Sequence, residues 1–321
     1  MRSGDLDFFL ERLRGIAGDR FDEFLMALSK PRGIALRANT LRTTPEALRA
    51  GLESEGFRLE PLPWYPAGFL LRSGETRGLS FTAPAKRGEL FVQNVSSMIP
   101  PLALAVRPGE RVLDIAAAPG AKTTQIACLL GGTGELVAND RSRKRSYRLR
   151  AILVEQGVPN ALVTCEPGEE YARKQPERFD RVLVDAPCSA EGLFVIPRSS
   201  TWQDWSIGKV RRCARVQGRL VRAGLAALRE GGVLVYSTCT FAPEENEAVI
   251  QGVLEEFRGA VEAEEIPLDF AGALPGLEGW GGRRFDPALR KCVRVAPDEY
   301  REGFFIARLR KTANFGARTG R

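Results

Sequence analysis

Two cysteines of the sequence stand where an apolar run gives way to small and polar residues. Cys188 lies in the run Val-Asp-Ala-Pro-Cys-Ser, and Cys239 lies in the run Tyr-Ser-Thr-Cys-Thr. Each follows a stretch with the composition of a buried strand, and the carboxyl ends of parallel strands meet at one edge of a sheet. We therefore expect the two thiols to be neighbours in space. A single cysteine at such a place is more often a packing residue, but two at adjacent strand ends are unlikely to arise by chance, so the pair is a candidate for reactive thiols.

The neighbouring residues and the composition limit the kinds of catalysis in which these thiols can take part. Asp185 and the rigid Pro187 precede the first thiol and bring a carboxylate to the same strand end. The sequence contains no histidine, which excludes imidazole bases, Ser-His-Asp and Cys-His pairs and most zinc sites. No two cysteines are within four residues of each other, so CxxC pairs are absent and no metal is expected. The other cysteines are interpreted as packing residues: Cys128, Cys165, Cys213 and Cys292.

A loop of small residues follows the strand expected at 112–115 and leads into a helix. Its members are Ala116, Ala117, Ala118, Pro119, Gly120, Ala121 and Lys122. Small side chains let backbone amides and a helix N-terminus approach a ligand closely. Asp140 ends the next expected strand, where an acid typically binds the ribose hydroxyls of a nucleoside-containing cofactor. An ordinary strand-turn-helix explains the same pattern, and the GxGxxG motif of dinucleotide sites is incomplete.

Alternating strands and helices must position these groups. From Arg111 onward, apolar runs bounded by turn residues alternate with helical stretches, among them a long helix near 208–229. Continuous apolar strands separated by helices predict an α/β fold with a doubly wound, mostly parallel sheet covered on both faces. Ligands bind such sheets at the carboxyl ends of the strands, which is where the thiols and the small-residue loop fall.

The first ninety or so residues follow another pattern. Apolar residues at helical spacing predict helices at 5–14 and 19–29. A strand is expected at 34–41, followed by a helix with Thr44 as N-cap and Pro45 in its first turn, and then by further short strands. The expected domains are a helical segment at 1–33, a smaller N-terminal α+β domain at 34–93, a catalytic domain at 94–312 and a basic tail at 313–321.

Basic residues outnumber acidic ones, with 47 Lys and Arg against 40 Asp and Glu, and only eight of the 47 are lysines. The planar guanidinium of arginine matches phosphate and stacks on bases, which favours a nucleic-acid partner. GC-rich coding or heat adaptation explains the composition equally well. On the expected long helix, arginines repeat at three- and four-residue spacing: Arg211, Arg212, Arg215, Arg219 and Arg222. This stripe suits a phosphate backbone, and acidic partners within the fold explain it as well.

Targeting signals are not expected. The N-terminal run Met-Arg-Ser-Gly-Asp-Leu-Asp mixes acids into its apolar stretch, unlike a signal or transit peptide. No uncharged apolar stretch approaches the roughly 20 residues that cross a bilayer. We expect a cytoplasmic, monomeric protein with reduced cysteines and no membrane partner.

Four longer motifs contain or follow the residues described so far: LDIAAAPGAKTTQIA, LVDAPCSAEG, LVYSTCTFAPEENE and EGFFIARLRK. They resemble the motifs of the RsmB/Nop/Sun family of RNA (cytosine-C5) methyltransferases. The N-terminal SKPRGIALRANTLR and FVQNVSSMIPPLAL are also similar, so the resemblance covers nearly the whole chain. The closest likeness is to the bacterial RsmF type, which acts on small-subunit rRNA, and shorter tRNA-modifying members share the same core.

The resemblance implies a seven-stranded, Rossmann-like class I methyltransferase sheet at 94–312, with S-adenosylmethionine as the cofactor and RNA as the partner. It also implies that the small α+β domain at 34–93 is RNA-recognition-like, although this segment lacks the aromatic RNP pattern. It implies that Cys239 attacks C6 of a cytosine, that Cys188 helps to release the product, and that Asp185 hydrogen-bonds the base. The cofactor residues that it implies are Ala116, Ala117, Ala118, Pro119, Gly120, Ala121, Lys122, Asp140, Pro167 and Asp185.

Three positions depart from the family pattern. Ala121 and Ala190 stand where the family usually has another small residue and glycine, respectively. Pro167 stands where the family usually has an Asp that contacts the adenine amine, and Glu166 is a candidate to replace it. The alternatives left open are the same chemistry on tRNA, a DNA cytosine methyltransferase with Cys188 as nucleophile, and a non-catalytic RNA-binding factor of ribosome assembly.

Overall fold

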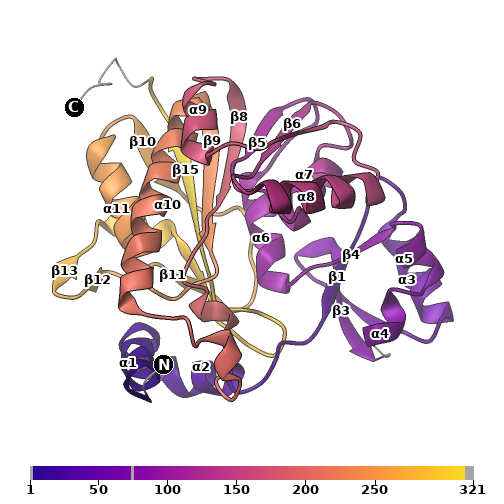
Figure 1. Cartoon of the computed structure of the whole chain (residues 1–321), viewed down its shortest axis with the longest axis horizontal. Helices are drawn as coiled ribbons and strands as arrows, with labels where there is room; N and C mark the ends of the chain where they lie inside the picture. Colours follow the sequence, from indigo (N-terminus) through magenta and orange to yellow (C-terminus); the bar gives the residue numbers. More distant parts are fainter. Residues whose placement is uncertain (1–2, 74–75, 315–321) are drawn as a thin grey trace.

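Two β-sheets and the helices around them make up the protein, as a computed structural model shows for residues 3–73 and 76–314 (Figure 1). The smaller sheet comes from the N-terminal part of the chain, and the larger one from the rest. The basic tail expected at 313–321 lies outside these residues except for its first two positions.

The smaller sheet is antiparallel, in the order β2-β3-β1-β4. Its strands are β1 (Ala35–Ala38), β2 (Arg58–Leu62), β3 (Tyr65–Ser73) and β4 (Leu90–Val92), with helices α3 (Pro45–Ser54), α4 (Thr76–Leu79) and α5 (Ala83–Lys86). The cap predicted for the first of these helices is confirmed, since Thr44 Oγ1 accepts the N–H of Ala47 at 3.2 Å and Pro45 begins the helix.

The two N-terminal helices, α1 (Ser3–Ala17) and α2 (Phe21–Leu28), pack on the larger unit. The ring of Phe9 lies 5.0 Å from the ring of Phe194, and the ring of Phe24 lies 5.5 Å from that of Phe241. Figure 1 shows these helices near the start of α10 (Ile207–Ala227). The helical segment therefore covers the loops that follow two strands of the larger sheet.

The larger sheet has the order β11-β14-β15-β9-β8-β5-β6-β7, with β10 also paired to β15. Its parallel strands are β5 (Arg111–Asp114), β6 (Glu135–Asn139), β7 (Ala161–Thr164), β8 (Phe179–Asp185) and β9 (Leu228–Thr238). Its antiparallel strands are β10 (Val261–Glu264), β11 (Ala273–Pro275), β14 (Val293–Val295) and β15 (Phe304–Lys311). The predicted doubly wound, mostly parallel α/β sheet is confirmed.

The predicted strand number of seven is wrong, because the described sheet has nine strands. Two short strands share the position beyond β15: β10 pairs with its residues 308–311, and β14 pairs with its residues 304–306. The chain adds β11 outside β14, and a two-stranded hairpin of β12 (Gly279–Trp280) and β13 (Arg283–Arg284) lies in the same segment.

Helices cover both faces of the larger sheet, which explains its continuous apolar strands. The helices are α6 (Val95–Leu104), α7 (Ala121–Leu129), α8 (Arg143–Glu155), α9 (Gly168–Arg173), α10 and α11 (Glu247–Glu256). Along β8, Val182 and Val184 pack in one cluster with α10 and α11, whereas Leu183 packs in another with α6 and α7. The chain winds from β5 outward to β7 and returns to β8 on the other side of β5, so a crevice opens at the carboxyl ends of these strands.

A buried arginine joins the two sheets. Arg37 of β1 has no exposed surface, and its guanidinium donates to Gln93 Oε1 at 2.8 Å, Thr124 Oγ1 at 2.6 Å and the carbonyl of Ala121 at 3.1 Å. The last two acceptors belong to α7, which also carries Lys122. The small sheet thereby fixes the helix that follows the small-residue loop.

Candidate active site

The two strand-end thiols lie in contact. Strands β8 and β9 pair in parallel with Asp185 opposite Ser237, so the residues just beyond them emerge side by side. The sulfur atoms of Cys188 and Cys239 are 3.0 Å apart, and both cysteines are free and partly buried. The structure therefore brings together the pair that the sequence predicted.

The contact has an electrostatic consequence for one of the thiols. The hydrogen bond with Cys239, together with burial, raises the pKa of Cys188 well above its ordinary value. Cys188 therefore holds its proton at neutral pH and can donate an S–H to the sulfur of Cys239. This arrangement suits a thiolate at Cys239.

A carboxylate and an ammonium lie at the same edge of the sheet. Asp185 Oδ2 accepts from Lys122 Nζ at 2.6 Å, and Asp185 Oδ1 accepts from Ser237 Oγ at 2.7 Å. Burial disfavours the charge of Lys122, yet the attraction and hydrogen bond of Asp185, with smaller contributions from other acidic groups, outweigh it and raise the pKa of the ammonium. The first turn of α7 thus reaches across to the end of β8 and fixes the carboxylate.

The loop after Cys188 is held in an unusual backbone conformation. Ala190 has φ +66°, in the left-handed region that favours glycine. Gly192 donates its N–H to the carbonyl of Cys239 at 2.9 Å, and a Cβ at that position would lie 2.0 Å from the carbonyl oxygen of Gly303. The loop therefore needs a glycine at 192 to keep the backbone of Cys239 in place.

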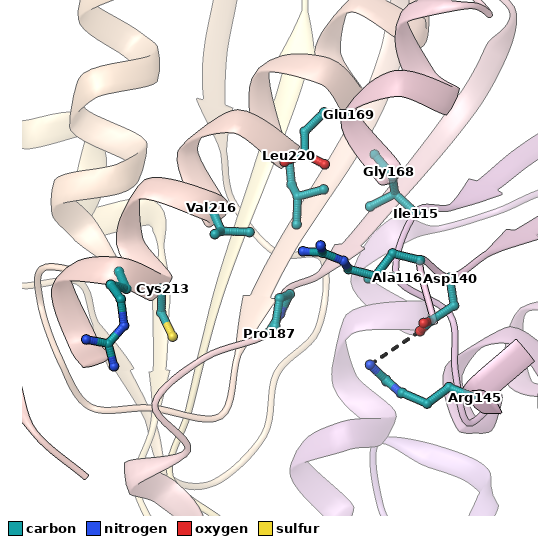
Figure 2. A pocket seen from close by; sticks show the side chains of 12 residues that line it. Ile115, Ala116, Asp140, Arg145, Gly168, Glu169, Pro187, Cys213, Val216 and Leu220 are labelled. Carbon is teal, nitrogen blue, oxygen red and sulfur yellow. Dashed lines mark ion pairs between the residues drawn. The ribbon is translucent and has the colours of Figure 1, made fainter. Parts of the chain in front are cut away.

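A cavity of about 270 Å³ lies beside this edge, between the carboxyl ends of the parallel strands and α10 (Figure 2). Its lining residues are Ile115, Ala116, Asp140, Arg141, Arg145, Gly168, Glu169, Pro187, Arg212, Cys213, Val216 and Leu220. Two of the predicted cofactor residues, Ala116 and Asp140, belong to this lining. The others do not: Ala117, Ala118, Pro119, Gly120, Ala121, Lys122, Pro167 and Asp185.

Asp140 is held firmly at one end of the cavity. Its Oδ1 accepts the N–H of Ser142 at 2.9 Å, and its Oδ2 accepts the N–H of Ala118 at 3.3 Å. Arg145 Nη1 lies 3.4 Å from the same Oδ2, the ion pair drawn in Figure 2. The small-residue loop therefore contributes to the site by orienting this carboxylate.

Glu169 is a second carboxylate of the cavity, and it was not predicted from the sequence. Glu166 pairs with Lys174 Nζ at 2.6 Å and does not line the cavity. Glu169 does, from the first turn of α9, where Arg219 Nε lies 3.3 Å from its Oε1. The available signal was the run Glu-Pro-Gly-Glu-Glu, in which a further acid follows Pro167 by two residues.

The long helix α10 forms one wall of the cavity, which the sequence did not reveal. Cys213, Val216 and Leu220 face it (Figure 2), and burial raises the pKa of the Cys213 thiol to about 11. The arginines of the stripe on this helix fall into two groups. Arg219 forms an ion pair with Glu169, and Arg222 forms one with Glu256. The exposed members without such pairs in the described structure are Arg211, Arg212 and Arg215.

Metal-binding clusters and membrane spans are both absent from the described part of the chain. Residues 3–73 and 76–314 contain no group of three or more His, Cys, Asp or Glu side chains that could hold a metal ion. Among the same residues, no helix has the length and apolar character of a membrane span.

Models of known protein families match most of the chain and show the family to which it belongs. The family model described as 16S rRNA methyltransferase RsmB/F matches residues 101–310. The chain belongs to the RsmB/F family of RNA methyltransferases. A second model, the N-terminal domain of 16S rRNA methyltransferase RsmF, matches residues 7–94. The resemblance seen in the sequence motifs is confirmed, and the larger sheet is that of a class I methyltransferase.

Individual relatives fall into two groups by the RNA in their names. The RsmB/F chain is 41% identical over 295 residues to tRNA (cytosine(49)-C(5))-methyltransferase of Pyrococcus abyssi, covering 91% of this chain and 93% of the relative. It is 39% identical over 297 residues to ribosomal RNA small subunit methyltransferase F of Klebsiella pneumoniae, covering 91% of this chain but only 60% of the relative. A solved structure, a methyltransferase homolog protein from Pyrococcus horikoshii, matches with a TM-score of 0.83 and 34% identity, over 95% of this chain and 94% of that one.

Proposed function

We propose that this RsmB/F chain uses S-adenosylmethionine to methylate C5 of cytosine in RNA, through a covalent bond between Cys239 and C6 of the base. The observation that carries the proposal is the 3.0 Å contact between Cys188 and Cys239 beside the Asp185 carboxylate. Small-subunit rRNA is the favoured substrate, because the RsmF N-terminal model matches residues 7–94. Transfer RNA is the second candidate, because of the 41% identity to the P. abyssi enzyme.

A thiolate is needed because C5 of cytosine is a poor nucleophile. When the Cys239 thiolate adds to C6, the electrons of the C5–C6 double bond move to C5, which can then form a bond to an electrophilic carbon. Release requires transfer of the C5 proton to a base such as water; the electrons of the C5–H bond then restore the C5–C6 double bond, and the sulfur leaves as a thiolate. The S–H of Cys188, whose pKa is raised, stabilises that departing thiolate by a hydrogen bond.

Asp185 has the position and the support to orient the base. One of its oxygens is bonded to Lys122 and the other to Ser237, so the carboxylate cannot rotate freely. It can accept hydrogen bonds from the exocyclic amine and from N3 of cytosine once N3 is protonated. The negative charge of the carboxylate stabilises the N3 proton, and that proton draws electrons away from C6. Addition of the thiolate becomes easier as a result.

The cavity beside the thiols fits the cofactor by the chemistry of its lining. When bound, S-adenosylmethionine supplies the methyl group as an electrophilic carbon. Asp140, already oriented by two backbone N–H groups, would accept the ribose hydroxyls. Glu169 would accept from the adenine amine in the place where Pro167 has no side-chain acceptor, and the apolar side chains of Ile115 and Leu220 would contact the base.

The test is direct methyl transfer from labelled S-adenosylmethionine to small-subunit rRNA, tRNA transcripts and duplex DNA, with bisulfite sequencing of the product. We expect 5-methylcytosine at defined positions in one RNA class. Labelled DNA would overturn the proposal in favour of a DNA methyltransferase, and RNA binding without transfer would favour a non-catalytic assembly factor. The cytoplasmic location and monomeric state expected from the sequence stay predictions.

A further inference from the structure

A carboxyl and an amide lie directly behind the Cys188 loop. Glu245 and Gln217 both have no exposed surface. Glu245 Oε2 accepts the N–H of Ser189 at 2.9 Å and Gln217 Nε2 at 2.7 Å. The same Nε2 donates to the carbonyl of Pro187 at 3.0 Å. The two side chains therefore hold the residues on both sides of Cys188.

Each member of this pair also has a buried oxygen without a hydrogen-bond partner. These atoms are Glu245 Oε1 and Gln217 Oε1. An ionised carboxylate and an amide oxygen are both acceptors, so neither can satisfy the other, and buried acceptors left without donors destabilise a fold. A carboxylic acid has an O–H donor. A carboxylic acid and a primary amide can pair through two hydrogen bonds, N–H to O and O–H to O. The first of these is the contact between Gln217 Nε2 and Glu245 Oε2, and the second would use the two unpartnered atoms.

We propose that Glu245 is a neutral carboxylic acid whose proton, on Oε1, is donated to Gln217 Oε1, and that this acid–amide pair is a positioning element for Cys188. Burial raises the pKa of Glu245 to about 7, in agreement with a bound proton. The groups that interact with it electrostatically are Glu191 and Cys188 from the loop after β8, Cys213 from α10 and Tyr236 from β9. None of these four groups is a cation that would favour ionised Glu245.

The neutral form has a consequence for the thiols. A charge on Glu245 opposes negative charge on Cys188, since the carboxylate contributes to the raised pKa of that thiol. With Glu245 neutral, the thiol pair carries its negative charge without a second anion behind it. This part of the inference rests on the proposed function of the thiols, whereas the protonation state itself does not.

The first experiment observes the proton by infrared difference spectroscopy between pH 5.5 and 8.5, in H₂O and D₂O. Burial also raises the pKa values of Asp114 and Glu302 to about 7, so the contribution of Glu245 is obtained by difference from the Glu245→Gln spectrum. We expect this difference to contain a carboxylic-acid C=O band that shifts in D₂O and disappears with an apparent pKa near 7. Glu244→Gln is the matched control, because Glu244 is ion-paired with Arg12 at 2.7 Å and its pKa is lowered. Gln217→Leu should keep the band but move it, since the acid loses its acceptor; an unchanged spectrum in both Glu245→Gln and Gln217→Leu overturns the proposal.

The second experiment follows stability against pH. The folded pKa of about 7 exceeds the ordinary value of a glutamate, so Glu245 retains a proton in the folded protein at pH values where it is ionised in the unfolded chain. The contribution is complete below about pH 4.3 and is lost as the pH rises through 7. The urea midpoint of the wild type should therefore fall relative to that of Glu245→Gln between pH 5 and 8, and parallel curves contradict the inference.

The third readout connects the pair to turnover. In single-turnover methylation, the rate ratio of Glu245→Gln to wild type should rise at least threefold from pH 6.5 to 8.5, and Glu245→Ala should lose activity at both values. A constant ratio contradicts the effect on the thiols. If the wild type methylates no RNA, the proposed function fails, while the infrared and urea results still decide the protonation state.

Discussion

The ends of β8 and β9 hold a closely packed set of polar groups, whereas the ends of β5 and β6 open onto a cavity whose far wall comes from α10. We call the ends of β8 and β9, with Cys188, Cys239 and Asp185, the thiol edge. Each of these three side chains has a hydrogen-bond partner at 3.0 Å or less. In the cavity, Asp140 pairs with Arg145 and Glu169 pairs with Arg219, and a space of about 270 Å³ lies between the elements. If the proposed function is correct, bonds are made and broken at the ends of β8 and β9, whereas the cavity only binds the cofactor. We therefore expect substitutions at the thiols to have larger effects than substitutions in the cavity.

The largest effect is expected at the thiol edge. Cys239→Ala should abolish methyl transfer and leave no covalent RNA adduct, because no sulfur can add to C6. Cys188→Ala should still permit attack and methylation but slow release, so a protein–RNA complex should accumulate. Denaturing electrophoresis with and without ribonuclease detects it.

The double substitution Cys188→Ala, Cys239→Ala provides the control and should show no adduct. If the adduct instead accumulates in Cys239→Ala, then Cys188 is the nucleophile and the DNA-type mechanism regains its place. In that case both thiol assignments at this edge are reversed.

In the cavity, the largest effect is expected at Asp140. If Asp140 binds the ribose as proposed, Asp140→Ala removes charge-assisted hydrogen bonds, each worth about 1.5–3 kcal/mol. Affinity for S-adenosylmethionine should weaken at least tenfold by calorimetric titration, while circular dichroism shows a retained fold. Unchanged affinity in the folded variant would remove Asp140 from the cofactor site.

Glu169 should have a smaller effect on the same affinity. If Glu169 accepts from the adenine amine as proposed, Glu169→Ala removes one hydrogen bond, and because Arg219 already pairs with this carboxylate we expect a loss of about 1 kcal/mol, or roughly fivefold in affinity. Glu170→Ala, an exposed acid on the same helix, is the matched control and should leave the affinity unchanged. Equal affinities of the two variants would show that Glu169 only anchors Arg219.

Substitutions in the arginine stripe of α10 test whether its arginines bind RNA or only form ion pairs within the protein. Arg212→Ala with Arg215→Ala should flatten the dependence of log K on log salt by about 0.7 for each phosphate that is no longer neutralised. Arg222→Ala, which breaks the pair with Glu256, should leave that slope unchanged and slightly lower the stability. Filter binding of RNA across a salt series measures both slopes, and equal slopes would place the RNA path elsewhere.

The smallest expected effect concerns the backbone of the thiol edge. Ala190 has φ +66°, a conformation that costs an alanine about 1–2 kcal/mol. Ala190→Gly relieves that cost but loses about 0.4–1 kcal/mol through the greater freedom of the unfolded chain. We expect a net stabilisation of about 0.5–1 kcal/mol by urea unfolding. A destabilised glycine variant would show that the methyl group of Ala190 packs usefully.

The sequence by itself predicted the alternation of strands and helices, the doubly wound sheet and the meeting of two thiols at one edge. These features are local or topological. Apolar runs report strands covered on both faces, and parallel strands necessarily bring their carboxyl ends together. The N-cap at Thr44 belongs to the same class, because a cap depends on residues within one helical turn.

Only the tertiary structure decided which side chains share a cavity and which form ion pairs. Glu169 lines the cavity, whereas Glu166 pairs with Lys174, and α10 forms one wall. Helices α1 and α2 pack on the larger unit, and β10 and β14 both pair with β15 at the sheet edge. The physical reason is that these outcomes depend on the packing of segments far apart in the chain. The hydrophobic periodicity of a helix or strand shows which of its faces is apolar. It does not show which side chains of another segment will pack on that face.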